Sequence, residues 1–290
     1  MDWFLLTLLS AFAFASADAA TKKFFADAGV WDTVVVRFVL SGMALLPWLA
    51  LTYEAPTSWH FWPWLGTLIP LDIAAIYLYV RAITAAPFSH TLPYLAFTPV
   101  LTAASGWLLL GEAIPAHGLA GIVLVSLGAY LLNLDGATWR ADKLAPFRFI
   151  LREQGPRLML GVAVIFSITA TLGKGAMQYM PAPLFDPFYS AVLAAATALV
   201  VFARQRRVFT IVHRRPLGAA LVSGAMAIMV LAHFIAIERV EVAYMIAVKR
   251  TSMLFGLVYG ALLFGETQLG RNLAAGVIMV GGVILLTAWQ

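Results

Sequence analysis

GWLLLGEAIPAHGLAGIVLVSLGAYLL, at Gly106–Leu132, recurs in altered form as GALLFGETQLGRNLAAGVIMVGGVILL, at Gly260–Leu286. The two stretches are offset by 154 residues, and about eleven of their twenty-seven aligned residues are identical. The same offset aligns Asp32 with Asp186 without a gap. Self-similarity at a fixed offset predicts that the chain duplicates one structural unit.

The composition is that of a membrane protein. Of the 290 residues, 62% are hydrophobic and 11% are charged, whereas soluble proteins average roughly 45–50% apolar and about 25% charged residues. A helix that crosses the hydrocarbon core needs about 20 mostly apolar residues. Apolar stretches of this length recur along the whole chain and predict ten spans with short connections.

The predicted spans divide into two sets of five. They cover approximately residues 3–25, 31–51, 61–83, 88–110, 115–134, 157–180, 184–203, 216–237, 241–266 and 269–289. We expect an all-α polytopic membrane protein with a first repeat in residues 1–134, a basic connector in 135–155 and a second repeat in 156–290. Because five is odd, the second repeat enters the membrane inverted. Inverted repeats are typical of secondary transporters, whose substrate site lies near the midplane between the repeats.

Each half ends with an apolar span, a Gly-Glu pair and a Gly-rich final span, the pairs being Gly111-Glu112 and Gly265-Glu266. In this arrangement the chain resembles, over essentially its whole length, the EamA-like branch of the drug/metabolite transporter superfamily. The resemblance implies that the first four spans of each half line a central cavity and that spans 5 and 10 pack outside it. It also implies export or exchange of amino acids or other small metabolites, driven by protons or by a counter-substrate.

The ninth predicted span carries two adjacent cations, Lys249 and Arg250, near its middle. An ionised Lys or Arg at the bilayer centre costs about 2.5–3.5 kcal/mol unless water, a carboxylate or an anionic ligand compensates it. An Arg fork beside a Lys point charge suits a carboxylate or phosphate, so both residues are candidates for substrate binding. The alternative is that they pair with protein carboxylates or extend to a membrane interface.

A Lys-Arg pair also occurs on this span in the similar triose-phosphate translocators of the same superfamily, where it holds the phosphate of the substrate. The present chain has VKRTS instead of their full motif. The resemblance therefore implies a shared role in anion binding rather than a shared substrate.

Four more side chains are candidates for substrate binding. Lys174 lies in an apolar span between two glycines, a setting typical of a helix that forms a cavity wall, although a Lys near a span end can also reach the interface. Tyr79 and His233 are equivalent under the 154-residue offset and predict two rings that face each other across the pseudo-two-fold axis. For His233 the alternative is a hydrogen-bonded packing role. Tyr94 is a further cavity candidate, for which the alternative is a role at the interface or in packing.

Two carboxylates are candidates for proton coupling. Asp18 and Lys22 lie four residues apart on one helical face, which predicts an internal ion pair or, alternatively, a proton acceptor that separates from its Lys during transport. Asp72 is either a proton carrier or the countercharge of the Lys-Arg pair. Glu112 and Glu266 precede the last spans of the two halves, where a carboxylate can cap unpaired amides, and we expect both to be structural.

The fourth and ninth spans differ in a way that concerns helix continuity. Pro93 and Pro99 predict a loosened fourth span, because Pro cannot donate a backbone hydrogen bond. The ninth span has no Pro at the equivalent positions, so we expect one helix over residues 241–266.

Several classes of protein are excluded. The sequence has no Cys, so disulfides, thiolate metal sites and Cys nucleophiles cannot occur. Its five His residues show no metal-ligand spacing, and there is no GxSxG, P-loop or dinucleotide-binding motif. The net charge of +5 fits basic cytoplasmic loops better than nucleic-acid binding. We therefore expect no enzyme activity, no metal site and no cofactor.

The sequence predicts a secondary active transporter that exports or exchanges a small anionic or zwitterionic metabolite, such as an amino acid or an organic or phosphorylated acid, by alternating access. We expect it in a bacterial cytoplasmic (inner) membrane as a monomer or homodimer. The alternative is a carrier or flippase for a lipid-linked or amphiphilic substrate, which would need a lateral opening toward lipid. Loop cations concentrate in the odd-numbered connections and place both termini outside, whereas the resemblance implies that both lie inside.

Overall fold

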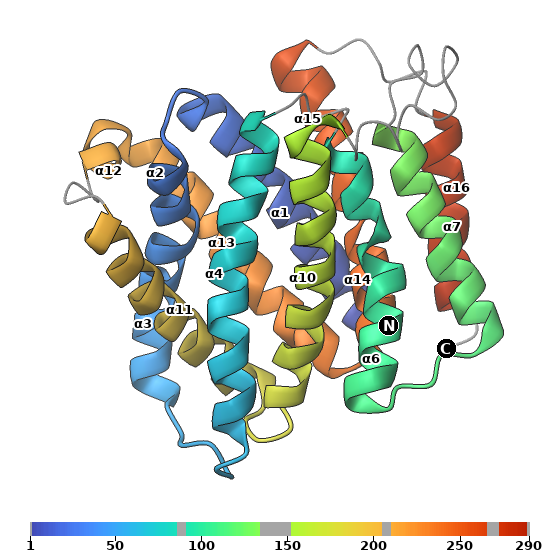
Figure 1. The fold of residues 1–290 in the computed structure, drawn as a ribbon, viewed down its shortest axis with the longest axis horizontal. Coiled ribbons are helices and arrows are strands. Elements are labelled where there is room, and N and C mark those ends of the chain that lie inside the picture. The colour runs from blue at the N-terminus through green and yellow to red at the C-terminus, as the bar shows by residue number, and fades with distance from the viewer. Residues whose placement is uncertain (1, 86–90, 134–151, 205–209, 266–272, 289–290) are drawn as a thin grey trace.

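Every regular element in the described part of the chain is a helix (Figure 1). The computed structural model describes residues 2–85, 91–133, 152–204, 210–265 and 273–288. Within these ranges, eight helical segments are long and apolar enough to cross a membrane, and two shorter apolar helices accompany them. The predicted all-α membrane fold is confirmed.

The long segments come four from each half, and the predicted spans match them to within a few residues. Those of the first half are α1 (Asp2–Phe25), the run of α2 (Val30–Val34), η1 (Val35–Val39) and α3 (Leu40–Thr52), then α4 (Phe61–Ala85), and η2 (Leu92–Phe97) with α6 (Thr98–Leu110). Those of the second half are α10 (Gln154–Ala176), α11 (Ala182–Arg204), α13 (Pro216–Glu238), and α14 (Val242–Lys249) with α15 (Ser252–Phe264). The short helix α12 (Thr210–Arg214) precedes α13.

The two remaining helices, α7 (Ala116–Asn133) and α16 (Leu273–Thr287), pack against each other at one edge of the bundle (Figure 1). Equivalent glycines let their backbones approach. A Cβ on Gly128 would lie 2.6 Å from the backbone nitrogen of Met279, and one on Gly282 would lie 2.7 Å from that of Val125. Small residues that allow such close packing are typical of helix pairs in membranes.

The duplication is visible in the backbone. Helices α6 and α15 begin at Thr98 and Ser252 and end before Gly111 and Gly265, in each case 154 residues apart. Both glycines adopt the left-handed conformation, with φ of 71° and 67°, which lets the chain turn at a helix C-terminus at little steric cost. The repeat in the sequence therefore corresponds to a repeat in structure.

The ninth span differs from the prediction of one continuous helix. It consists of α14 and α15, separated at Arg250 and Thr251, where the backbone nitrogens of both residues donate to carbonyls three residues earlier. The fourth span is interrupted at the equivalent place, since the 3-10 helix η2 gives way to α6 at Thr98. A Pro is thus present at the first interruption and absent from the second, which the sequence rule for Pro could not predict.

Candidate substrate-binding cavity

A cavity of about 170 Å³ lies near the middle of the bundle. All eight long segments contribute residues to its lining, whereas α7 and α16 contribute none. This is the arrangement expected for the first four spans of each half. Most of the lining is apolar and aromatic, including Phe14, Phe38, Phe166 and Phe234.

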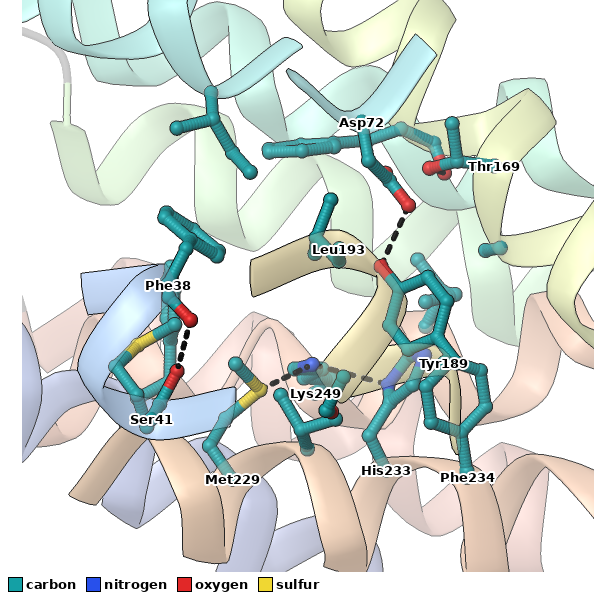
Figure 2. A pocket seen from close by; sticks show the side chains of 18 of the residues that line it. Phe38, Ser41, Asp72, Thr169, Tyr189, Leu193, Met229, His233, Phe234 and Lys249 are labelled. Atoms are coloured by element: carbon teal, nitrogen blue, oxygen red, sulfur yellow. Dashed lines mark hydrogen bonds between the residues drawn. The ribbon is translucent and has the colours of Figure 1, made fainter. Parts of the chain in front are cut away.

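Lys249, the last residue of α14, lines this cavity without a carboxylate partner. Its Nζ lies 3.0 Å from Nδ1 of His233 and 3.2 Å from Sδ of Met229 (Figure 2), and 5.9 Å from the ring centre of Phe14. None of these neighbours carries a compensating negative charge. The ammonium group is therefore held in place by soft and neutral groups.

Arg250 also lines the cavity and is only 8% exposed. Its Nε has no hydrogen-bond partner, and in the described residues neither Arg250 nor Lys249 forms an ion pair with a carboxylate. Ser252 follows at the start of α15, is buried and lines the same cavity. The predicted alternative, in which the two cations pair with protein carboxylates, is therefore not supported by any described contact.

Asp72 of α4 lines the cavity and accepts a hydrogen bond from a hydroxyl group, and among the described residues it forms no ion pair. The Tyr189 hydroxyl donates to Asp72 Oδ2 at 2.6 Å (Figure 2). The Tyr189 ring is held by stacking on Phe185, with ring centres 5.6 Å apart, and by an edge contact with Phe234 at 5.2 Å. The cavity thus has a cationic and an acidic group with apolar surface around them.

Asp18 does not pair with Lys22 as predicted, because its partner comes from another helix. Arg37 donates from Nη1 to Asp18 Oδ1 at 2.6 Å and to Thr21 at 3.3 Å. Arg37 is 5% exposed and lies in the π-helical segment η1, a distortion that is frequent at functional sites. The Lys22 ammonium group instead lies 4.4 Å from the ring centre of Phe264.

Lys174 is not among the residues that line the cavity. Its Nζ donates to Glu112 Oε1 and to the carbonyl oxygen of Val240, both at 2.6 Å. Glu112 Oε2 accepts a hydrogen bond from the backbone nitrogen of Val242 at 2.9 Å. Glu112 therefore caps the start of α14, not the start of the helix that follows it in sequence, and Glu266 lies outside the described residues.

Of the predicted pair Tyr79 and His233, only His233 lines the cavity. Tyr79 packs on Phe166, with ring centres 6.5 Å apart. Tyr94 is 3% exposed and belongs to a hydrophobic cluster with Met159. Substrate contacts by Tyr79, Tyr94 and Lys174 remain predictions without a cavity contact to support them.

Sequence reasoning missed four residues of this region. Arg37 could have been found by the rule applied to Lys249, because it is a cation within an apolar span. Tyr189 and Ser252 carry no such signal, since a Tyr or Ser is common in any helix. Asp186 is fully buried with one unpartnered carboxylate oxygen, and its other oxygen accepts from Ser190, which lines the cavity.

The model of the EamA-like transporter family matches residues 1–134 and 154–288. The chain belongs to the EamA-like transporter family. This confirms the resemblance to the drug/metabolite transporter superfamily and identifies the chain as an integral membrane transporter of small molecules and not an enzyme.

A solved structure titled "Crystal structure of protein" has the same fold as this EamA-like transporter. The TM-score is 0.75, with 17% sequence identity over 99% of this chain and 97% of the other chain. At that identity the likeness concerns the fold alone. No curated protein sequence matches the chain.

Proposed function

We propose that this transporter is a secondary active carrier that exports or exchanges a small anionic or zwitterionic metabolite by alternating access. The observation that carries the proposal is the presence of Lys249 and Arg250 in the cavity lining without a carboxylate partner among the described residues. Two adjacent cations in an apolar, membrane-embedded cavity need a compensating negative charge. An anionic substrate provides that charge when it binds.

The chemistry around the cations defines what they bind. Arg250 offers a planar fork with an unpartnered Nε, and Lys249 offers a point charge, which together suit the two oxygens of a carboxylate or the oxygens of a phosphate. Ser252 adds a hydroxyl group beside them. His233 lies against Lys249 and orients it.

The rest of the cavity lining restricts the size and polarity of the substrate. A volume of about 170 Å³ admits a small metabolite, and the aromatic side chains favour one with an apolar body. Asp72 with Tyr189 offers a site for a substrate ammonium group or for a coupling proton. Asp18 already pairs with Arg37, so Asp72 is the better supported of the two predicted coupling residues. We propose that the protein resides in a bacterial inner membrane.

A thermal-shift screen of the purified protein tests this proposal. The library contains amino acids, monocarboxylates, phosphorylated acids and amphiphiles, so that it also covers the alternative of an amphiphilic substrate. A ligand present at 100 times its dissociation constant stabilises the protein by about 2.7 kcal/mol. We expect stabilisation by anions or zwitterions that is lost in Lys249→Ala and Arg250→Ala. If both variants bind these ligands as the parent protein does, the proposed role of the two cations is wrong.

Proton coupling is tested separately in liposomes with the ligand that the screen identifies. We expect Asp72→Asn to exchange this ligand across the membrane while losing accumulation driven by an imposed pH gradient. A parent protein whose accumulation ignores the pH gradient would exclude proton coupling and leave exchange as the mode of transport.

A further inference from the structure

Glu112 and Lys174 form, with the backbone of Val240 and Val242, a cluster that we call the clasp. Lys174 donates to Glu112 and to the Val240 carbonyl oxygen, and Glu112 accepts from the Val242 nitrogen. The clasp therefore holds the turn that joins α13 to α14 at two points, Val240 within the turn and Val242 at the start of α14. Both charged side chains are partly buried, at 21% exposure for Lys174 and 12% for Glu112.

The end of α6 is built to present Glu112. Gly111 takes the left-handed conformation at the helix C-terminus, and its nitrogen donates to the Trp107 carbonyl oxygen at 3.1 Å, as in an αL motif. The Glu112 nitrogen donates back to the Gly106 carbonyl oxygen at 3.2 Å. A Cβ on Gly106 would lie 3.0 Å from Glu112 Oε2. Glycine at this position therefore leaves room for the carboxylate, and the local backbone aims it at the turn.

The clasp lies at the start of the helix that carries Lys249. Helix α14 has eight residues, from Val242 to Lys249, and spans about 12 Å. It begins at the clasp, ends at the cavity and is separated from α15 by the interruption at Arg250 and Thr251. The clasp and Lys249 therefore lie at the two ends of one short helix.

The clasp lies at one end of the bundle, where α6, α10 and α14 meet. Helices α6 and α10 both end at the lower side of the view in Figure 1, near the turn that starts α14. There α14 packs on α6 and α7. The clasp and the packing of α14 thus join α6, α10 and α14 at this end of the bundle, as expected of a closed gate.

We propose that the clasp is the releasable lock of this closed gate, an inference that rests on the proposed transport function. Release breaks the two hydrogen bonds to the turn and leaves the Glu112–Lys174 ion pair intact between α6 and α10. No charge is stranded, and water replaces the lost partners of Val240 and Val242. Opening of the lock therefore costs the free energy of two hydrogen bonds. Substrate binding that moves α14 can provide this free energy.

Because the chain has no Cys, spin labels can be attached to introduced Cys residues without first removing native ones. Spin labels at Ala113→Cys and Arg239→Cys, two exposed positions on either side of the clasp, report its opening by double electron–electron resonance in liposomes. We expect one short distance in the parent protein. In Lys174→Ala and Glu112→Gln the fraction of a longer distance rises about fivefold or more, as the loss of one hydrogen bond predicts.

Two further variants separate a lock from a merely structural contact. Gly106→Ala crowds the carboxylate without changing any charge and should also raise the long-distance fraction. Asp27→Asn, which removes an ion pair with Arg215 elsewhere in the molecule, should leave the distances unchanged. If Lys174→Ala, Glu112→Gln and Gly106→Ala lower thermal stability but keep the parent distances, the lock does not exist.

The same samples distinguish this result from failure of the proposed function. Benzoate and inorganic phosphate serve as probes of anion binding by thermal shift. If neither stabilises the parent protein while the clasp variants open the gate, the anion proposal weakens and the lock stands. If an anion binds through Lys249 but the clasp variants keep the parent distances, the lock fails and the proposed function stands.

Discussion

The two halves surround one cavity with equivalent positions but supply opposite chemistry to it. Lys249 of the second half corresponds to Leu95 of the first, and Asp72 of the first half corresponds to Met226 of the second, and all four residues line the cavity. The cations therefore come from one half and the acid from the other. Duplication therefore preserved the backbone, whereas the side chains that line the cavity diverged, so that its cations and its acid come from opposite halves.

The shared features are those of the backbone. Both halves have an interruption before the helix that begins at Thr98 or Ser252, and both close that helix with a left-handed glycine. Two halves with equivalent backbones can exchange conformations, so that the two ends of the cavity open in turn, as alternating access requires. The unequal side chains then decide what is bound, and the clasp determines which end is closed.

The largest effect is expected where the halves differ most. Lys249→Leu gives the second half the residue that the first half has at this position. Hydrogen bonds to charged groups contribute about 1.5–3 kcal/mol, so anion affinity should fall about 100-fold. Titration of the screened ligand by thermal shift measures this change. Affinity within twofold of the parent protein would show that the charge difference between the halves has no role in binding.

A smaller effect sharpens the comparison between Ser252 and Thr98. The Thr98 hydroxyl already donates to the Leu95 carbonyl oxygen at 2.7 Å, whereas Ser252 Oγ makes no hydrogen bond within the described ranges. Ser252→Ala should weaken anion binding about tenfold, and the matched control Thr98→Ala should change it less than twofold. Equal losses of anion affinity in the two variants would indicate that Ser252 and Thr98 contribute equally to binding.

The preceding predictions concern side chains that differ between the halves. Substitutions at Gly111 and Gly265 test instead whether the backbones of the two halves are equivalent. Their positive φ angles differ by only a few degrees, and no neighbouring atom would contact an added Cβ at either site. Gly111→Ala and Gly265→Ala should each lower the free energy of unfolding by about 1–2 kcal/mol because of left-handed strain. Thermal unfolding compares them, and a large difference between the two would contradict backbone equivalence.

The smallest effect concerns an ion pair without a counterpart. Asp27 bonds Arg215 through both carboxylate oxygens, at 2.6 and 2.7 Å, whereas the equivalent positions are Pro181 and Phe61. The hydrogen bond from Arg215 lowers the pKa of Asp27 from 3.8 to about 2. A lowered carboxyl pKa stabilises the folded state above 3.8, and the contribution is lost as the pH falls toward 2.

The melting temperature of Asp27→Asn, compared with that of the parent protein at decreasing pH, checks this prediction. The pair is exposed to solvent, so the difference should be small at neutral pH. It should shrink further below the ordinary carboxyl pKa. A difference that grows on acidification would assign the effect to another group.

Much of the fold could be predicted from the sequence because it depends on local properties. The apolar spans and the repeat offset are readable residue by residue, and they placed the helices to within a few residues. The interruption after Lys249 could not be predicted, because no Pro or Gly marks it and it arises in the packed bundle. For the site, the cost of a charge in an apolar span marks Lys249 and Arg250, and it equally marks Arg37.

The sequence by itself determined the ten apolar segments, their duplication and the two unusual cations, since hydrophobicity, spacing and charge are properties of the chain. Only the tertiary structure decided the partners. Asp18 meets Arg37 instead of Lys22, and Lys174 meets Glu112, 62 residues away, instead of the cavity. Which side chains meet depends on how the helices rotate and cross when they pack, and in an apolar environment a buried charge is held by whichever partner that packing brings within reach.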